Sequence, residues 1–126
     1  MNKTVIASDK SPAAIGPYSQ AIEVNGFIYT SGIIGVDPKT GEAKNSIEEQ
    51  TKQVFDNMKG LLGDAGSSMN QVVKTTVFIK NMDDFGKVNE IYASYFDGAF
   101  PARSCVEVAR LPKDLLIEVE AIAIKG

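Results

Sequence analysis

The sequence contains no histidine among its 126 residues. Histidine is the usual general base near neutral pH, so its absence excludes Ser-His-Asp and Cys-His catalytic systems. Zinc sites are built mainly from histidine and cysteine, and a chain with one cysteine and no histidine argues against bound zinc. Any acid–base chemistry must therefore come from carboxylates, tyrosine, lysine or Cys105.

Cysteine is scarce as well, since Cys105 is the only one. A single cysteine excludes a disulfide framework within the chain and fits a reducing compartment. The sequence also lacks any stretch of roughly 20 apolar residues, the length that spans a bilayer. Its N-terminal residues carry no apolar run of signal-peptide length. Together these features predict a cytoplasmic protein without a membrane partner.

An excess of basic residues is missing too. The chain has 13 Lys and Arg against 16 Asp and Glu, which gives a net charge of −3 and a pI near 4.9. Proteins that follow nucleic-acid phosphates are usually basic, so no nucleic-acid partner is expected. With 44% hydrophobic and 23% charged residues, the composition is that of one globular domain over residues 1–126.

Hydrophobic periodicity and turn residues predict the element order β-β-β-α-β-α-β-β. The dipeptide Asn25-Gly26 joins two β-rich runs and predicts a type I′ hairpin. A helix is expected over 46–65, beginning with a capping box and stopping at Gly66. The remaining elements are expected at 72–79 (strand), 82–96 (helix), 104–109 (strand) and 115–124 (strand).

These elements predict an α+β fold, in which one mixed sheet carries two helices on one face. Gly60 and Gly63 in the first helix indicate close packing on that sheet. The last strand is apolar on both sides, with Val119 and Ala121 on one face and Ile122 on the other. A chain of this size should not expose such an area, so an oligomer that buries the uncovered face is expected.

Arg103 stands at the head of a half-buried strand. An unpaired buried charge costs several kcal/mol, so the guanidinium requires an anionic partner. That partner is either a structural carboxylate or the carboxylate of a ligand, which the planar fork of Arg grips with two hydrogen bonds. Glu118 and Glu120 share one face of the last strand, where burial would raise the pKa of a carboxyl toward the range of a general base.

Five further residues are candidates, each with a plainer structural interpretation. Tyr18 lies in a compact turn, and such a residue is often a packed aromatic. Ser31 and Gly32 follow a strand, where backbone N–H groups can meet an anion or the strand can simply end. Asn89 lies near the apolar stripe of the second helix, and such an Asn is usually a solvated or capping residue. The stripe consists of Phe85, Val88, Tyr92 and Tyr95. Cys105 is expected to be a small buried residue and not a nucleophile, because no histidine lowers its pKa.

Several blocks of the sequence form a series that runs along almost the whole chain. They are residues 13–20 (Ala-Ala-Ile-Gly-Pro-Tyr-Ser-Gln), 31–32 (Ser-Gly), 37–41 (Asp-Pro-Lys-Thr-Gly), 73–79 (Val-Lys-Thr-Thr-Val-Phe-Ile), 101–113 (Pro-Ala-Arg-Ser-Cys-Val-Glu-Val-Ala-Arg-Leu-Pro-Lys) and 117–121 (Ile-Glu-Val-Glu-Ala). This series resembles the RidA/YjgF family of imine and enamine deaminases, and the block at 101–113 is the most specific part of it.

The resemblance implies a chorismate-mutase-like fold and a homotrimer, with a central β-barrel, outer helices and ligand sites between subunits. The activity it implies is hydrolysis of 2-iminoacids and their enamine tautomers, such as 2-iminobutanoate and 2-iminopropanoate, to 2-ketoacids and ammonia. Such intermediates come from pyridoxal-phosphate-dependent dehydratases acting on Ser or Thr. This chemistry needs neither metal nor cofactor, since an imine carbon is already electrophilic.

By position, the resemblance implies three catalytic residues. Arg103 clamps the substrate carboxylate, Glu118 rather than Glu120 handles the attacking water, and Tyr18 lines the same cleft. The substrate-binding residues that it implies are Arg103, Ser31, Gly32, Asn89 and Cys105.

The chain departs from the family at one place. Many relatives read Ser-Gly-Gln-Ile-Pro where this chain reads Ser-Gly-Ile-Ile-Gly at 31–35. Ile33 thus replaces a polar residue at the edge of the predicted pocket, and Gly35 replaces a rigid proline. Two other functions stay open: a non-catalytic module that binds 2-ketoacids, and an RNA-acting or chaperone-like protein.

Overall fold

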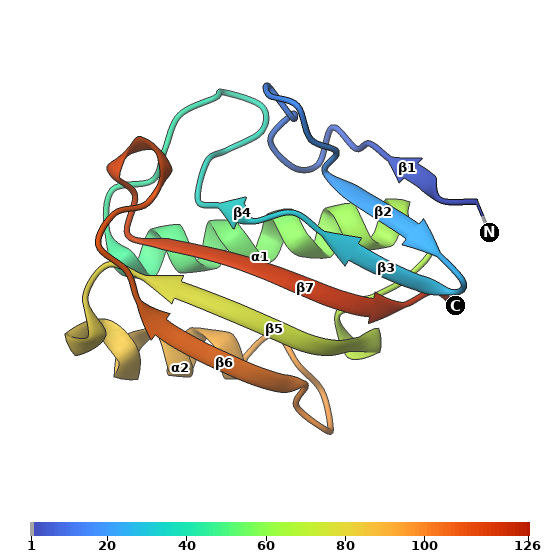
Figure 1. Ribbon diagram of the computed structural model, residues 1–126. Coiled ribbons are helices and arrows are strands. Elements are labelled where there is room, and N and C mark those ends of the chain that lie inside the picture. Colours follow the sequence, from blue (N-terminus) through green and yellow to red (C-terminus); the bar gives the residue numbers. More distant parts are fainter. Residues whose placement is uncertain (1) are drawn as a thin grey trace.

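The computed structural model describes residues 2–126, which form a mixed β-sheet with two α-helices (Figure 1). The strands are β1 (Thr4–Ile6), β2 (Ala21–Val24), β3 (Phe27–Thr30), β4 (Ile33–Ile34), β5 (Val72–Ile79), β6 (Ala102–Glu107) and β7 (Ile117–Ile124). The helices are α1 (Ile47–Asp64) and α2 (Phe85–Ala93), and short 3₁₀ turns span Met69–Gln71, Met82–Asp84 and Pro112–Asp114. No helix in residues 2–126 is long and apolar enough to cross a membrane.

The strand order is β1-β2-β3-β7-β5-β6, and β4 also pairs with β7, beyond the end of β3. Only β5 and β6 run parallel, and all other pairs are antiparallel. Figure 1 shows both helices behind the sheet, while the other face carries no helix. The predicted α+β architecture, with two helices on one face of a mixed sheet, is confirmed.

Local signals in the sequence fix several elements. Asn25 and Gly26 have φ values of 53° and 81°, as a type I′ turn between β2 and β3 requires. Ser46 caps α1 by accepting a hydrogen bond from the backbone N–H of Glu49 at 3.1 Å, and the reciprocal half of the capping box is present. Gly66 ends the helix with φ of 83°. The hairpin and the first helix are therefore as predicted.

Other boundaries differ from the prediction. Four strands precede α1 where the predicted order has three, because strands as short as β1 and β4 give little periodicity. Pairing with β2 holds β1 in place. The second helix is shorter than 82–96. A 3₁₀ turn capped by Asn81 precedes it, and the Ser94 hydroxyl bonds to the carbonyl of Ile91 as it ends. Strand β6 starts at Ala102, so Arg103 lies within the strand.

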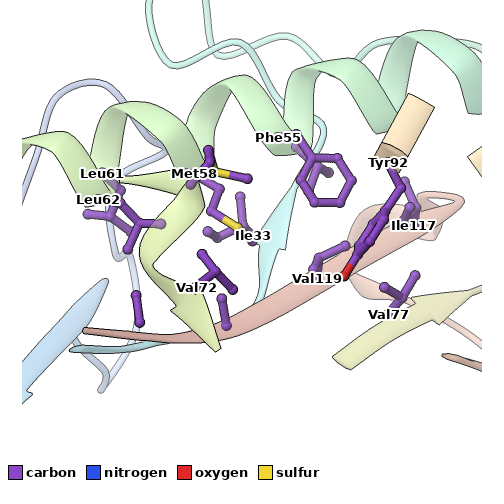
Figure 2. Close-up of a cluster of buried hydrophobic side chains, with 14 of the residues drawn as sticks. Ile33, Phe55, Met58, Leu61, Leu62, Val72, Val77, Tyr92, Ile117 and Val119 are labelled. Atoms are coloured by element: carbon purple, nitrogen blue, oxygen red, sulfur yellow. The ribbon is translucent and has the colours of Figure 1, made fainter. Parts of the chain in front are cut away.

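The hydrophobic core fills the space between the helices and the sheet (Figure 2). Phe55, Met58 and Leu62 of α1 belong to the same core cluster as Val77 and Val119 of the sheet, and none of the five is measurably exposed. Ile33 also belongs to this core, with 4% of its surface exposed. The position expected at the edge of a pocket therefore contributes mainly apolar packing.

The opposite face of the sheet remains apolar and open. Ile122 is the register partner of Tyr29, and Phe27 is that of Ile124. Phe27, Tyr29 and Ile124 are 39%, 44% and 40% exposed. The sequence thus correctly predicted an apolar face that no helix of its own chain covers.

Glycine packing differs from the expectation for α1. A Cβ at Gly60 would meet Lys10 of the N-terminal segment at 2.6 Å, while one at Gly63 would meet nothing within 4 Å. Close packing of these two residues on the sheet is therefore wrong. The close approach lies instead at Gly35, where a Cβ would come within 2.8 Å of the Cα and carbonyl oxygen of Gln50 in α1.

We expect Gly35→Ala to lower the free energy of unfolding by about 1 to 3 kcal/mol, because backbone atoms of α1 must move to admit the methyl group. Gly63→Ala is the matched control. It fills open space in a helix and should raise the free energy of unfolding by up to about 1 kcal/mol. Urea denaturation of both variants measures the difference. Equal stability of the two variants would contradict the close packing of α1 at Gly35.

Candidate functional site

Arg103 points to the helix side of the sheet. Its register partner on β5 is Thr75, which is fully buried beneath the helices, and partners in register share a face. Nη1 of Arg103 donates a hydrogen bond of 2.7 Å to Oδ1 of Asn89. Its Cζ lies 4.8 Å from the ring centroid of Tyr92 and 5.3 Å from that of Phe85. Helix α2 therefore holds the guanidinium with one amide and two aromatic rings.

No carboxylate of the described residues 2–126 lies within ion-pair distance of Arg103. The four ion pairs found in this range join other residues, and the Asn89 amide is neutral. Of the two partners left open by the sequence, a structural carboxylate is not present among residues 2–126. The remaining N–H donors of a partly buried guanidinium are thus available to an anion from outside these residues.

A cavity of about 390 Å³ adjoins the guanidinium. Its lining residues are Asn89, Tyr92, Ala93, Phe100, Pro101 and Arg103. Most of this wall is apolar, and the charged group is at one place. Such a surface suits a small ligand that combines one carboxylate with an apolar or uncharged remainder.

Cys105 lies two residues along β6, on the same side of the strand as Arg103. Partial burial raises the pKa of its thiol, and the nearby Arg103 charge offsets only part of that effect. The thiol therefore stays protonated at neutral pH, which agrees with a lining role and not with a nucleophile.

Glu118 lies on the open face of the sheet, opposite Phe78 of β5 and Ile34 of β4. Partial burial raises the pKa of its carboxyl, and repulsion from Glu120 adds to the shift. The carboxylate lies over Gly32, where any Cβ would overlap it. Gly32 is therefore the residue that lets Glu118 lie close to the backbone between β3 and β4.

Tyr18 and Ser31 belong to the same neighbourhood as Gly32. The Ser31 hydroxyl donates to the carbonyl of Ser19 at 2.6 Å, and its N–H donates to the carbonyl of Gln20 at 2.9 Å. The buried amide of Gln20 donates in turn to three carbonyl groups of the loop before it. Tyr18 is 51% exposed, and Tyr18, Ser31 and Gly32 all border a hollow of about 20 Å³.

The candidate residues thus form two groups. Arg103, Asn89 and Cys105 make the first, which we call the arginine group. Glu118 lies with Gly32 in the second, the glutamate group, which also contains Tyr18 and Ser31. Glu118 and Arg103 are two strands and three residues apart, so their Cα atoms are separated by about 14 Å. They also face opposite sides of the sheet. One small molecule cannot contact both within a single chain.

Sequence reasoning missed the two aromatic rings that lie against the guanidinium of Arg103. Phe85 and Tyr92 read as the apolar stripe of the second helix. Their spacing from Asn89, four residues before it and three after it, was the available signal. In residues 2–126, no cluster of three or more His, Cys, Asp or Glu side chains is arranged to hold a metal ion.

The structure is that of a small α+β protein with a cavity beside Arg103, and comparison with known proteins identifies its family. The family model described as Endoribonuclease L-PSP matches residues 8–125. A RutC family protein of Pyrococcus abyssi is 56% identical over 126 residues, which cover 99% of both chains. The 2-iminobutanoate/2-iminopropanoate deaminase of Escherichia coli K12 is 51% identical over 128 residues, again with 99% of both chains covered.

A solved structure agrees with these matches. The crystal structure of E. coli TdcF with bound serine has a TM-score of 0.94 and 41% identity, covering 98% of this chain and 99% of that one. The chain belongs to the RidA/YjgF family, as its sequence blocks indicated.

Proposed function

We propose that this protein hydrolyses reactive 2-iminoacids, such as 2-iminobutanoate and 2-iminopropanoate, to 2-ketoacids and ammonia. The observation that carries the proposal is the guanidinium of Arg103, which is held by Asn89 and two rings, has no carboxylate partner in residues 2–126 and borders a cavity. The E. coli relative named for this activity, at 51% identity over nearly the whole chain, supports the same assignment.

In the proposed reaction Arg103 grips the substrate carboxylate through two parallel hydrogen bonds. The imine is protonated on nitrogen, and its electrophilic carbon is then held beside a water molecule. Glu118 accepts a proton from that water as its oxygen bonds to the carbon, and the electron pair of the C=N bond moves to nitrogen. Glu118 returns the proton to the amine nitrogen. The C–N bond breaks as the remaining hydroxyl becomes the ketone, and the hydroxyl proton passes to the departing ammonia, which leaves as ammonium.

We infer that the working site lies between two copies of the chain, in a homotrimer. The separation of the arginine and glutamate groups by about 14 Å, on opposite faces of the sheet, supports this arrangement. The open apolar face around Phe27, Tyr29 and Ile124 provides a surface for assembly. In this arrangement Tyr18, Ser31 and Gly32 of one subunit face Asn89 and the backbone of Cys105 in its neighbour.

A coupled assay tests the activity. Threonine dehydratase releases 2-iminobutanoate, and the appearance of 2-oxobutanoate is followed with and without this protein. The proposal predicts faster formation of the ketoacid, in proportion to the amount of protein added. An unchanged rate at every protein concentration would reject it.

A 2-ketoacid-binding module is the main alternative, since it would use Arg103 in the same way without needing a base. The raised pKa of Glu118 favours the enzyme, because a carboxyl shifted toward neutral pH suits proton transfer. The family model carries the description of an endoribonuclease, but a net charge of −3 disfavours an RNA substrate. A filter-binding assay across a salt series tests for RNA binding.

A cytoplasmic location stays a prediction, which rests on the low cysteine content.

A further inference from the structure

Three side chains of α2 face Arg103. Phe85, Asn89 and Tyr92 are spaced four and three residues apart, so they share one face of the helix. Asn89 was predicted to be a site residue, whereas neither ring was, and neither has a role in the proposed reaction. Tyr92 is the nearer ring, with its centroid 4.8 Å from Cζ of Arg103. That distance is within the range of a cation–π interaction.

Tyr92 is itself held from two sides. Its hydroxyl and the hydroxyl of Thr75 are 2.7 Å apart, and the two residues are only 4% and 0% exposed. The ring of Phe55 packs edge-on against it, with centroids 5.3 Å apart. Figure 2 shows Tyr92 beside Phe55, with its hydroxyl oxygen directed to the sheet. A ring held at its tip and at its side has little freedom to turn.

These contacts link Thr75, Tyr92 and Arg103, each of which is a neighbour of the other two. Thr75 is the register partner of Arg103 on the neighbouring strand, its hydroxyl bonds to Tyr92, and the ring of Tyr92 lies against the Arg103 guanidinium. We propose that Tyr92, locked by Thr75, is a positioning residue that fixes the guanidinium of Arg103 with its unpaired donors facing the cavity. The inference rests on the proposed function, because it assigns what holds the clamp of that same site.

Arg103 benefits from being held in one conformation because the arginine side chain is flexible. A free Arg side chain populates many rotamers, and binding a small carboxylate would have to order it at the cost of affinity. A clamp that is already ordered grips the carboxylate of substrate and product alike. Loss of the ring should therefore weaken binding much more than it slows the chemical step.

The test uses Tyr92→Leu and Tyr92→Phe in the full chain. We expect Tyr92→Leu to raise the KM for 2-iminobutanoate and the Kd for 2-oxobutanoate by about tenfold, since a buried cation–π contact is lost. Its kcat should stay within about twofold, and the pH profile should keep its shape. Tyr92→Phe keeps the ring and should recover binding to within about threefold of wild type. Titration calorimetry gives the Kd, and the dehydratase-coupled assay gives KM and kcat.

Tyr95→Leu is the matched control. Tyr95 also packs on Phe55, with centroids 5.4 Å apart, and its hydroxyl donates to Asp56 at 2.8 Å, but no contact joins it to Arg103. Its replacement should lower stability and leave the Kd for 2-oxobutanoate unchanged. If Tyr92→Leu does not fold, Phe85→Leu removes the second ring beside Arg103. A Kd for 2-oxobutanoate raised about threefold would then support the positioning of Arg103 by the rings of α2.

Two results would overturn the inference. One is a folded Tyr92→Leu protein, or a Phe85→Leu protein in its place, with the wild-type Kd. The other is an equal loss of binding in Tyr95→Leu, which would mean that the core has simply loosened. Both leave the proposed function intact if the wild type binds 2-oxobutanoate and speeds imine hydrolysis. A wild type that does neither would remove the proposed function and this inference with it.

Discussion

Arg103→Ala should lose about 30-fold to 5,000-fold in kcat/KM for 2-iminobutanoate, since removing one partner of a desolvated charge pair costs roughly 2 to 5 kcal/mol. The guanidinium makes no ion pair within residues 2–126, so its removal leaves no carboxylate of these residues unpaired. The effect should therefore fall on the ligand and spare the fold. Initial rates in the dehydratase-coupled assay measure it.

Two further variants sharpen this result. Arg103→Lys keeps the charge but lacks the planar fork, so its activity should fall between those of wild type and Arg103→Ala. Arg110→Ala removes an exposed arginine whose ion pair with Asp114 lies outside the site, and it should keep wild-type activity. Full turnover by a folded Arg103→Ala protein of unchanged oligomeric state would refute the clamp.

Glu118→Gln should lower kcat by roughly 10² to 10⁴, the contribution typical of a positioned acid–base group. Its Kd for 2-oxobutanoate should change by no more than about threefold, because the carboxylate is gripped by Arg103 and not by Glu118. Glu120→Gln is the matched control, since Glu120 is two residues along the same strand and face but is exposed. It should retain most of the activity. A Glu118→Gln protein as active as wild type would favour the binding module.

The pH dependence of kcat in wild type and in Glu118→Gln gives a second test of Glu118 as the base. Burial raises the pKa of Glu118 above its ordinary 4.5, so its carboxyl takes up a proton at a higher pH than an exposed glutamate does. The deprotonated base form of Glu118 is lost as pH falls. Wild-type kcat should therefore decrease with falling pH, and the midpoint of this decrease should lie above pH 4.5. In Glu118→Gln this acid limb should be absent. If kcat decreases at the same acid pH in both proteins, the decrease belongs to a group other than Glu118.

The parts of the fold that the sequence predicted correctly are those whose causes are local. The Asn25-Gly26 turn, the capping box at Ser46 and the β-branched run of β5 each act through neighbouring residues. Arg103 was expected at the head of a strand over about 104–109, yet β6 already begins at Ala102, because parallel pairing with β5 extends it. That pairing joins residues about thirty positions apart and leaves no local trace in the sequence.

The candidate site, like the fold, was predictable only where its causes are local. Alternation along a strand tells which residues share a face, but it does not tell which faces of two strands coincide. Only the register, with Thr75 opposite Arg103 and Phe78 opposite Glu118, shows that these two side chains lie on opposite faces. The sequence also could not decide between an ion pair and a clamp at Arg103. That choice depends on whether a carboxylate comes within reach in three dimensions.

The central claim is that Arg103 of one subunit and Glu118 of another act on one substrate. Subunit mixing tests it most directly: Arg103→Ala and Glu118→Gln chains are refolded together in equal amounts and assayed. If each site takes one residue from each of two neighbouring chains, one site in three of every trimer that contains both variants regains both groups. Random mixing therefore restores about a quarter of all sites, and activity should approach a quarter of wild type. Activity no higher than that of the two parent variants, in oligomers shown to be mixed, would contradict the account.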